Sequence, residues 1–197
     1  MPVSVAPEPS PPQAEPSPTQ SDPSWPVLLH ATPRHGRLVL DTHVLLEALL
    51  WQSPRHAQLL PLLLTGCAIA LRSEATAREW ARVLRYPMLR LDATKLADAE
   101  ARYVRYTRAE SEPDPRALAQ LPRCADRDDQ KFLELAWHAG AHALLTRDQR
   151  LLKIGKHRLY RARFVVASPE TWRANGASLW AQVSARKQSA AAANKGF

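Results

Sequence analysis

The sequence of 197 residues predicts an α/β fold in which a parallel sheet carries helices on both faces. Short apolar runs typical of buried strands alternate with longer segments of helical periodicity. Carboxylates follow several of the apolar runs, and ligands of open parallel sheets bind outside the carboxyl ends of the strands. With 45% hydrophobic residues, the chain can bury one core. We therefore expect one domain with an acidic site at a sheet edge.

The first half of the body reads as strand, helix, helix, strand and helix. The apolar run 37–41 is too short for a helix, and the segment 44–51 that follows it continues as one. The leucine-rich segment 55–64 ends before a glycine, which is typical of a helix terminus. Residues 67–71 form a second strand. A serine then caps a helix over 73–84, which a proline three residues later terminates.

The second half continues the alternation after a proline-rich connection. Residues 94–110 predict a long helix, and residues 128–139 another with its apolar side chains on one face. Strands are predicted over 143–146 and 163–167. A further helix begins with the triplet Ser-Pro-Glu at 168–170, which supplies a cap, a first-turn proline and a first-turn acid.

The two ends of the chain differ in composition from the body, which we place at residues 34–176. Residues 1–33 hold ten of the 17 prolines and no Lys or Arg, and residues 177–197 are rich in Ala, Ser and Lys. Both segments are predicted to be disordered. Setting the first 33 residues aside leaves 27 Lys and Arg against 16 acids, a net charge of +11. Such a charge favours a polyanionic partner.

Other features predict a cytoplasmic protein without a membrane segment. The N-terminus lacks the basic and apolar regions of a signal peptide. The longest apolar stretches are far shorter than the roughly 20 residues of a membrane span. Two cysteines are too few for a disulfide framework and read as buried structural residues.

Acids gather near the ends of four segments and predict a metal site. Each has an ordinary alternative: Asp41 as a helix cap, Glu79 as a solvated partner of Arg82, Asp148 as a turn residue, and first-turn acids as helix stabilisers worth about 0.3–1 kcal/mol each. Three acids within four residues exceed what one cap needs. Clustered carboxylates repel one another and attract a cation, and oxygen ligands suit Mg²⁺ or Mn²⁺. The candidate ligands and catalytic residues are Asp41, Glu79, Asp126, Asp129 and Asp148.

Four motifs in order resemble a PIN-domain nuclease, most of all the bacterial group described as toxin components of toxin–antitoxin systems. They are LDTHVLLEALL at 40–50, the helix 73–87 with Glu79, CADRDDQKFLELA at 124–136 and LTRDQRLL at 145–152. The resemblance covers residues 37 to about 173. It implies a three-layer α/β/α sandwich with a central parallel sheet, divalent-metal-dependent cleavage of single-stranded RNA and a cognate antitoxin; relatives often form homodimers.

The resemblance assigns the four acidic positions of the family to Asp41, Glu79, Asp129 and Asp148, and an extra acid of the subgroup to Asp126. One position departs from the pattern, because His43 stands where the family usually has Asn. His can still hydrogen-bond the pocket or a phosphate, and it can titrate near pH 6.5.

Further residues are candidates for supporting roles. Side chains next to the acids could orient the ligands or water, and cations after the fourth motif could bind phosphates. Trp51, Trp80 and Trp137 fall on apolar helical faces and read as core residues rather than platforms for bases. The orienting candidates are Thr42, His43, Ser73 and Thr146, and the substrate-binding candidates are Lys153, Lys156, Arg158 and Arg161.

Two other functional classes remain open. An aspartate-nucleophile phosphotransferase would also place Asp41 after the first strand, but it normally needs a second acid where His43 stands. The second is a PIN-like module that binds RNA or protein and cleaves poorly. The complete acidic set argues against it, whereas His43 slightly favours it.

Overall fold

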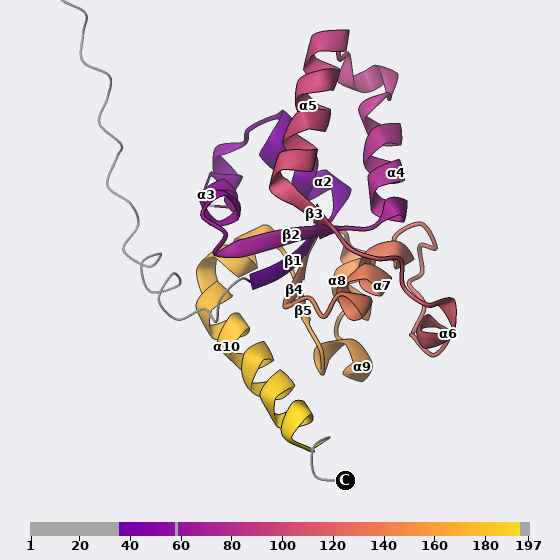
Figure 1. The fold of residues 1–197 in the computed structure, drawn as a ribbon, viewed down its shortest axis with the longest axis vertical. Coiled ribbons are helices and arrows are strands. Elements are labelled where there is room, and N and C mark those ends of the chain that lie inside the picture. Colours follow the sequence, from indigo (N-terminus) through magenta and orange to yellow (C-terminus); the bar gives the residue numbers. More distant parts are fainter. Residues whose placement is uncertain (1–35, 58, 194–197) are drawn as a thin grey trace, which may run out of the picture.

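The computed structural model of the chain describes residues 36–57 and 59–193 (Figure 1). It has a central sheet of five strands, all parallel, in the order β3-β2-β1-β4-β5. This confirms the predicted parallel sheet. The predicted disordered tail at 1–33 lies outside the described residues. The strands are β1 Gly36–Leu40, β2 Ala68–Arg72, β3 Thr107–Ala109, β4 Ala143–Leu145 and β5 Val165–Ala167.

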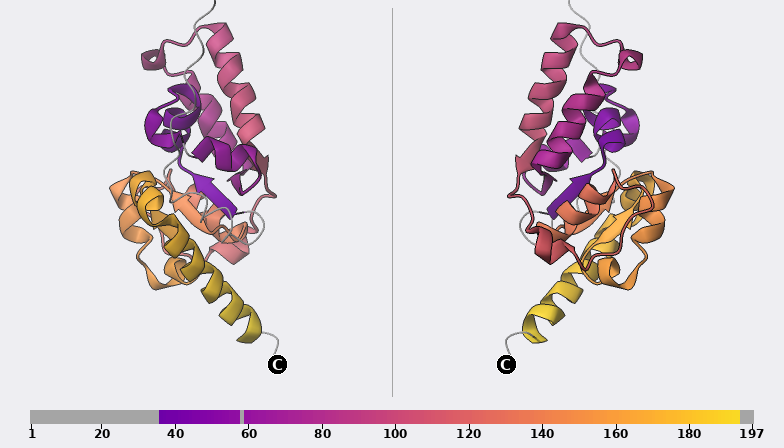
Figure 2. Two further views of the ribbon diagram at one scale, coloured as in Figure 1. Left: turned by 90° about the vertical axis from the view of Figure 1, so that its left-hand side faces the viewer. Right: turned by 90° about the vertical axis from the view of Figure 1, so that its right-hand side faces the viewer.

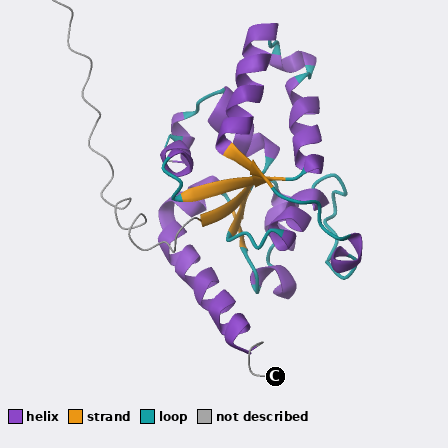
Figure 3. Cartoon of the chain, in the orientation of Figure 1, coloured by secondary structure: helices purple, strands orange, loops and turns teal. Residues whose placement is uncertain are grey.

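Helices cover both faces of the sheet and complete the predicted α/β/α sandwich (Figure 3). Leu38 and Leu40 of β1 point into one core, which Trp80 and Trp172 share. Val39 points into the other core. The helices on the first side include α2 Thr42–Leu45, η1 Leu46–Leu50, α3 Leu59–Leu64, α4 Glu74–Leu84, α5 Ala93–Tyr106 and α10 Pro169–Ala193; those on the second include α7 Gln130–His138, α8 Gln149–Ile154 and α9 Arg158–Arg161.

Short helical turns complete the chain: η2 Pro54–His56, η3 Pro87–Leu89 and α6 Pro115–Leu118. Among the described helices, none combines the length and the apolarity that a membrane crossing requires.

The edge strand β3 was not predicted, because residues 94–110 were expected to form one helix. The helix α5 ends at Tyr106, and Thr107 takes an extended conformation with φ −124° and ψ 150°. The guanidinium of Arg72 donates hydrogen bonds to the carbonyl and the hydroxyl oxygens of Thr107, at 2.6 and 2.7 Å. This tertiary contact fixes the chain beside β2, and local periodicity cannot reveal it.

The last helix corrects the predicted boundary at residue 176. Instead of an irregular tail, α10 continues to Ala193 and projects from the body (Figure 2). Alanine is the strongest helix former, and Trp180 and Val183 bury their side chains against the domain. A Cβ atom added to Gly36 would lie 1.6 Å from the Trp180 ring, so the glycine lets this ring approach the start of β1. Residues 194–197 lie outside the described chain.

Candidate active site at the carboxyl edge of the sheet

Asp41 stands directly after β1 at the centre of the carboxyl edge. Its backbone N–H donates to the carbonyl of Leu145, and its side chain caps α2 by accepting from the N–H of His43 at 3.0 Å. The predicted capping role is therefore present. Burial raises the pKa of Asp41 more than its hydrogen bonds from Thr146 and the His43 backbone lower it. A helix cap can remain exposed, whereas Asp41 is half-buried.

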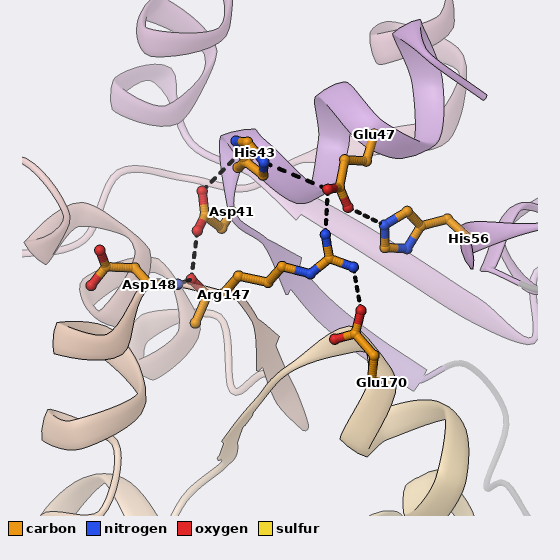
Figure 4. Close-up of polar contacts among 8 residues, drawn as sticks. Asp41, His43, Glu47, His56, Arg147, Asp148 and Glu170 are labelled. Atoms are coloured by element: carbon orange, nitrogen blue, oxygen red, sulfur yellow. Dashed lines mark hydrogen bonds and ion pairs between the residues drawn. The ribbon is translucent and has the colours of Figure 1, made fainter. Parts of the chain in front are cut away.

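Thr146 connects Asp41 to Asp148. Its buried hydroxyl donates to Oδ2 of Asp41 and accepts from the backbone N–H of Asp148 at 2.9 Å. Asp148 in turn caps α8, because its Oδ1 accepts from the N–H groups of Arg150 and Leu151. One oxygen of Asp148 thus serves the helix, while its position after β4 sets it beside Asp41 (Figure 4).

Asp129 lies where these acids converge, at the start of α7. Its side chain makes no capping hydrogen bond. Burial and the negative charges of Asp41, Asp126 and Asp148 raise the pKa of Asp129 to about 6, and Lys131 only partly offsets them. Asp126 accepts from the guanidinium of Arg150 at 2.9 Å. The four aspartates are therefore close enough for their charges to interact.

Glu79 joins the site from α4. The hydroxyl of Thr42 donates to Oε1 of Glu79 at 2.7 Å, and Oε2 forms an ion pair with Lys131. The predicted alternative was a solvated glutamate paired with Arg82. The structure does not support that alternative, since the Glu79 side chain is only 13% exposed and turns toward α2 and α7.

The donor set fits a hard divalent cation by its chemistry, because it consists of carboxylate oxygens held by hydroxyls. Within 36–57 and 59–193, no three His, Cys, Asp or Glu side chains come together tightly enough to form a metal site. Lys131 pairs with Glu79 and Arg150 with Asp126, so the charges of the other aspartates are not neutralised by these two cations.

Not all of the predicted supporting residues lie at this edge. Ser73 is buried in a capping box with Thr76 and serves helix α4. Helix α8 runs back from the carboxyl edge, so the predicted substrate-binding residues lie at or beyond its far end. Lys156 and Arg161 line a pocket of about 230 Å³ with Val165, the first residue of β5. The residues placed away from the acids are Ser73, Lys153, Lys156, Arg158 and Arg161.

A second charged cluster beside the acids was not predicted. Glu47 on η1, only 12% exposed, shares a hydrogen bond of 2.5 Å with the buried His56 and lies 3.5 Å from Nε2 of His43. The guanidinium of Arg147 contacts both Glu47 and Glu170 of α10 (Figure 4). We call these five residues the Glu47 cluster. The four-residue spacing of His43 and Glu47 was the only local signal for it.

Cations lower the acid pKa values in the Glu47 cluster. Burial would raise the pKa of Glu47, but the hydrogen bond from His56 and the charge of Arg147 lower it overall. Burial is likewise outweighed at Glu170 by its hydrogen bond from Arg147. Arg147 lies between Thr146 and Asp148 in sequence, and its side chain extends away from Asp148 (Figure 4). The cluster therefore holds the backbone that carries Thr146 and Asp148.

The PIN domain family model matches residues 37–150, which is more than half of the chain. The chain belongs to the PIN-domain family. No curated protein and no solved structure matches it. PIN domains are generally nucleases and typically use divalent metal ions, so family membership gives this chain a nuclease-type function.

Two side chains at or directly after the first motif lie at the edge of this site. His43 keeps its backbone N–H on Asp41, and its ring Nε2 lies 3.5 Å from Glu47. Trp51 was predicted to be a core residue, which is wrong because it is 51% exposed. Trp80 is buried as predicted, and Trp137 is partly buried. The wide turn of η1 changes the face on which Trp51 emerges, and a regular helical wheel cannot anticipate it.

Proposed function

We propose that this PIN domain is a divalent-metal-dependent endoribonuclease that cleaves single-stranded RNA. The observation that carries the proposal is the convergence of Asp41, Asp126, Asp129 and Asp148 at the carboxyl edge of a parallel sheet, with burial and mutual repulsion raising the pKa of Asp129 to about 6. Asp126 pairs with Arg150, but Asp41, Asp129 and Asp148 have no ion-pair partner among the described residues. Such carboxylates in a functional site are an unfavourable arrangement that a cation relieves.

The chain would hold Mg²⁺ or Mn²⁺ through the aspartates, with Glu79 completing the acidic set. When bound, such an ion orients a water molecule, lowers its pKa and offsets charge that develops on the phosphate. The protein's own part is to position its ligands. Thr146 orients Asp41, and Thr42 orients Glu79. Lys131 neutralises Glu79 and lies toward Asp129, where it would also attract a phosphate.

Cations on the α7 side of the site support a nucleic-acid substrate. Arg123, Arg127 and Lys131 line an open pocket of about 330 Å³ next to the acids of the third motif. Among the described residues, Arg123 and Arg127 have no ion-pair partner, so their guanidinium groups are free to contact phosphates. These two residues are better placed than the predicted cations beyond α8.

We further propose that the protein acts in the cytoplasm as the toxin of a toxin–antitoxin pair. A cognate antitoxin protein would be its partner, and a homodimer is the expected assembly of such relatives. The sequence resemblance to toxin components supports these roles. A PIN-like module that only binds RNA or protein is the second candidate, and the ring of His43, which contacts Glu47 of the Glu47 cluster, is the observation that favours it.

A cleavage assay with labelled single-stranded RNA tests the proposed function. We expect cleavage with Mg²⁺ or Mn²⁺, none with EDTA, and a loss of about 10²- to 10³-fold in Asp41→Asn, the scale of removing one electrostatic stabiliser of a transition state. The substitution keeps the side-chain shape and removes one charge. Circular dichroism should show an unchanged fold. Activity that survives both EDTA and Asp41→Asn would exclude the metal mechanism, and folded protein without cleavage would favour the binding module.

A further inference from the structure

We propose that His43 and Trp51 form a platform on which one unpaired base of the substrate stacks, next to the acid cluster. The inference rests on the proposed function and gives it a structural basis for choosing single strands. Bases in a duplex are already stacked on one another, whereas unpaired bases are free to stack on aromatic side chains.

Exposure is the first observation behind this platform. The His43 side chain is 58% exposed, and Trp51 is 51% exposed. Large aromatic residues normally bury most of their surface, as Trp80, Trp172 and Trp180 do in this chain. Two neighbouring aromatic rings therefore keep about half of their surface available for a ligand.

The geometry of the two rings is compatible with a third ring. Their centroids are 5.9 Å apart and their planes are inclined by 72°, so they meet edge to face and do not stack on each other. A regular α-helix would separate residues eight apart by about 12 Å along its axis. The π-helical segment Leu46–Leu50 lies between the two residues, interrupts that repeat and brings the rings together. Such interruptions often occur at functional sites.

Glu47 helps to hold the His43 ring of the platform in place. Glu47 lies 3.5 Å from the ring nitrogen Nε2 of His43, and Glu47 is itself fixed by His56 and Arg147. A side chain that is already ordered loses little conformational entropy when a ligand binds. The exposed imidazole of His43 is therefore partly ordered before a base binds.

Position identifies the ligand as nucleic acid. The backbone N–H of His43 donates to the carboxylate of Asp41, so the platform adjoins the proposed catalytic edge. A base stacked there belongs to a nucleotide near the phosphate at the acids. Stacking tolerates every base, so the platform selects unpaired nucleotides without selecting a sequence.

Binding of labelled oligouridylate in EDTA tests the platform without requiring cleavage. Fluorescence anisotropy should show affinity weakened by about 5- to 140-fold in Trp51→Ala, the range for loss of one stacked base. Trp51→Phe should retain most of the affinity. His43→Asn should weaken it in the same direction. Met88→Ala is the matched control, because Met88 is 81% exposed on η3 and should leave the affinity unchanged.

An abasic strand of equal length and charge supplies the decisive comparison. Wild type and Trp51→Ala should bind it equally, because the platform contacts only a base. Equal losses on normal and abasic strands would overturn the proposal, as would a Trp51→Ala variant that changes the sedimentation of the protein but not its affinity for RNA. Failure of cleavage with the discrimination intact would reject the nuclease mechanism and leave the platform standing.

Discussion

Two acidic clusters lie side by side at the carboxyl edge of the sheet, and they differ in how their charge is compensated. In the Glu47 cluster, Arg147 contacts both glutamates, and the pKa values of Glu47 and Glu170 are lowered. In the aspartate cluster, the pKa values of Asp41 and Asp129 are raised. The first arrangement stabilises the fold, whereas the second costs stability that a ligand can return. Both clusters are acidic, but only the Glu47 cluster has its acids neutralised by a shared cation, and this difference distinguishes the structural cluster from the proposed catalytic one.

Among the changes that test the difference between the two clusters, the largest effect is expected from Thr146→Val, which keeps the side-chain shape but removes the hydroxyl shared by Asp41 and Asp148. Loss of a group that orients metal ligands typically costs about 10- to 100-fold in activity or metal affinity. Cleavage rates measured against Mn²⁺ concentration would show it. Ser73→Ala is the control, because its hydroxyl caps α4 away from the acids. Equal rates for the two variants would show that Thr146 has no role in the site.

A smaller effect is expected when Arg147 is removed from the Glu47 cluster. Arg147→Met leaves Glu47 without its strongest cation while Glu47 remains largely buried, so the free energy of unfolding should fall by about 1–3 kcal/mol. Urea denaturation at neutral pH measures this change. Glu170→Gln is the control: Glu170 is half exposed, and its loss should cost less than about 1 kcal/mol. If both variants were as stable as wild type, the Glu47 cluster would not be a scaffold.

The smallest effect is expected from neutralising one acid of the aspartate cluster, and it should stabilise the protein rather than destabilise it. Because the folded-state pKa of Asp129 is raised from 3.8 to about 6, its contribution to stability is full below 3.8 and is lost as the pH rises through about 6. In EDTA at neutral pH, Asp129→Asn should therefore unfold at or above the wild-type temperature. In a domain of this size, a gain of about 1 kcal/mol in the free energy of unfolding raises the midpoint by about 2–4 °C.

Two further melts complete this test. The difference between Asp129→Asn and wild type should shrink toward pH 4, where both side chains are neutral. Millimolar Mn²⁺ should raise the wild-type midpoint more than that of the variant. A variant that melts well below wild type in EDTA, with equal shifts in Mn²⁺, would identify Asp129 as a structural residue.

The sequence predicted the elements that depend on local pattern. Apolar runs marked β1, β2, β4 and β5, and the acids after them marked the edge where the aspartates meet. Features made by contacts between distant residues were missed. The strand β3 depends on Arg72, and the Glu47 cluster joins residues that lie up to 127 positions apart, from His43 to Glu170. Contacts between residues so far apart in sequence leave no periodic pattern in the sequence around β3 or around Glu47.

The exposure of Trp51 shows a second limit, because a helical wheel assumes a regular helix. One wide turn over 46–50 moved a predicted core residue to the surface. The C-terminal tail shows a third, since its sparse apolar residues, Trp180 and Val183, sufficed to bury a face of α10.

The course of α10 also sets the smallest piece of this chain that should fold by itself. A fragment ending at residue 150, where the family match ends, would lack β5 and leave one side of β4 without its neighbour. It would also uncover the ring of His142, which stacks on Trp180 at 4.3 Å. The genetic unit to be expressed, fused or transplanted therefore reaches at least Val183, about thirty residues beyond the segment that defines the family.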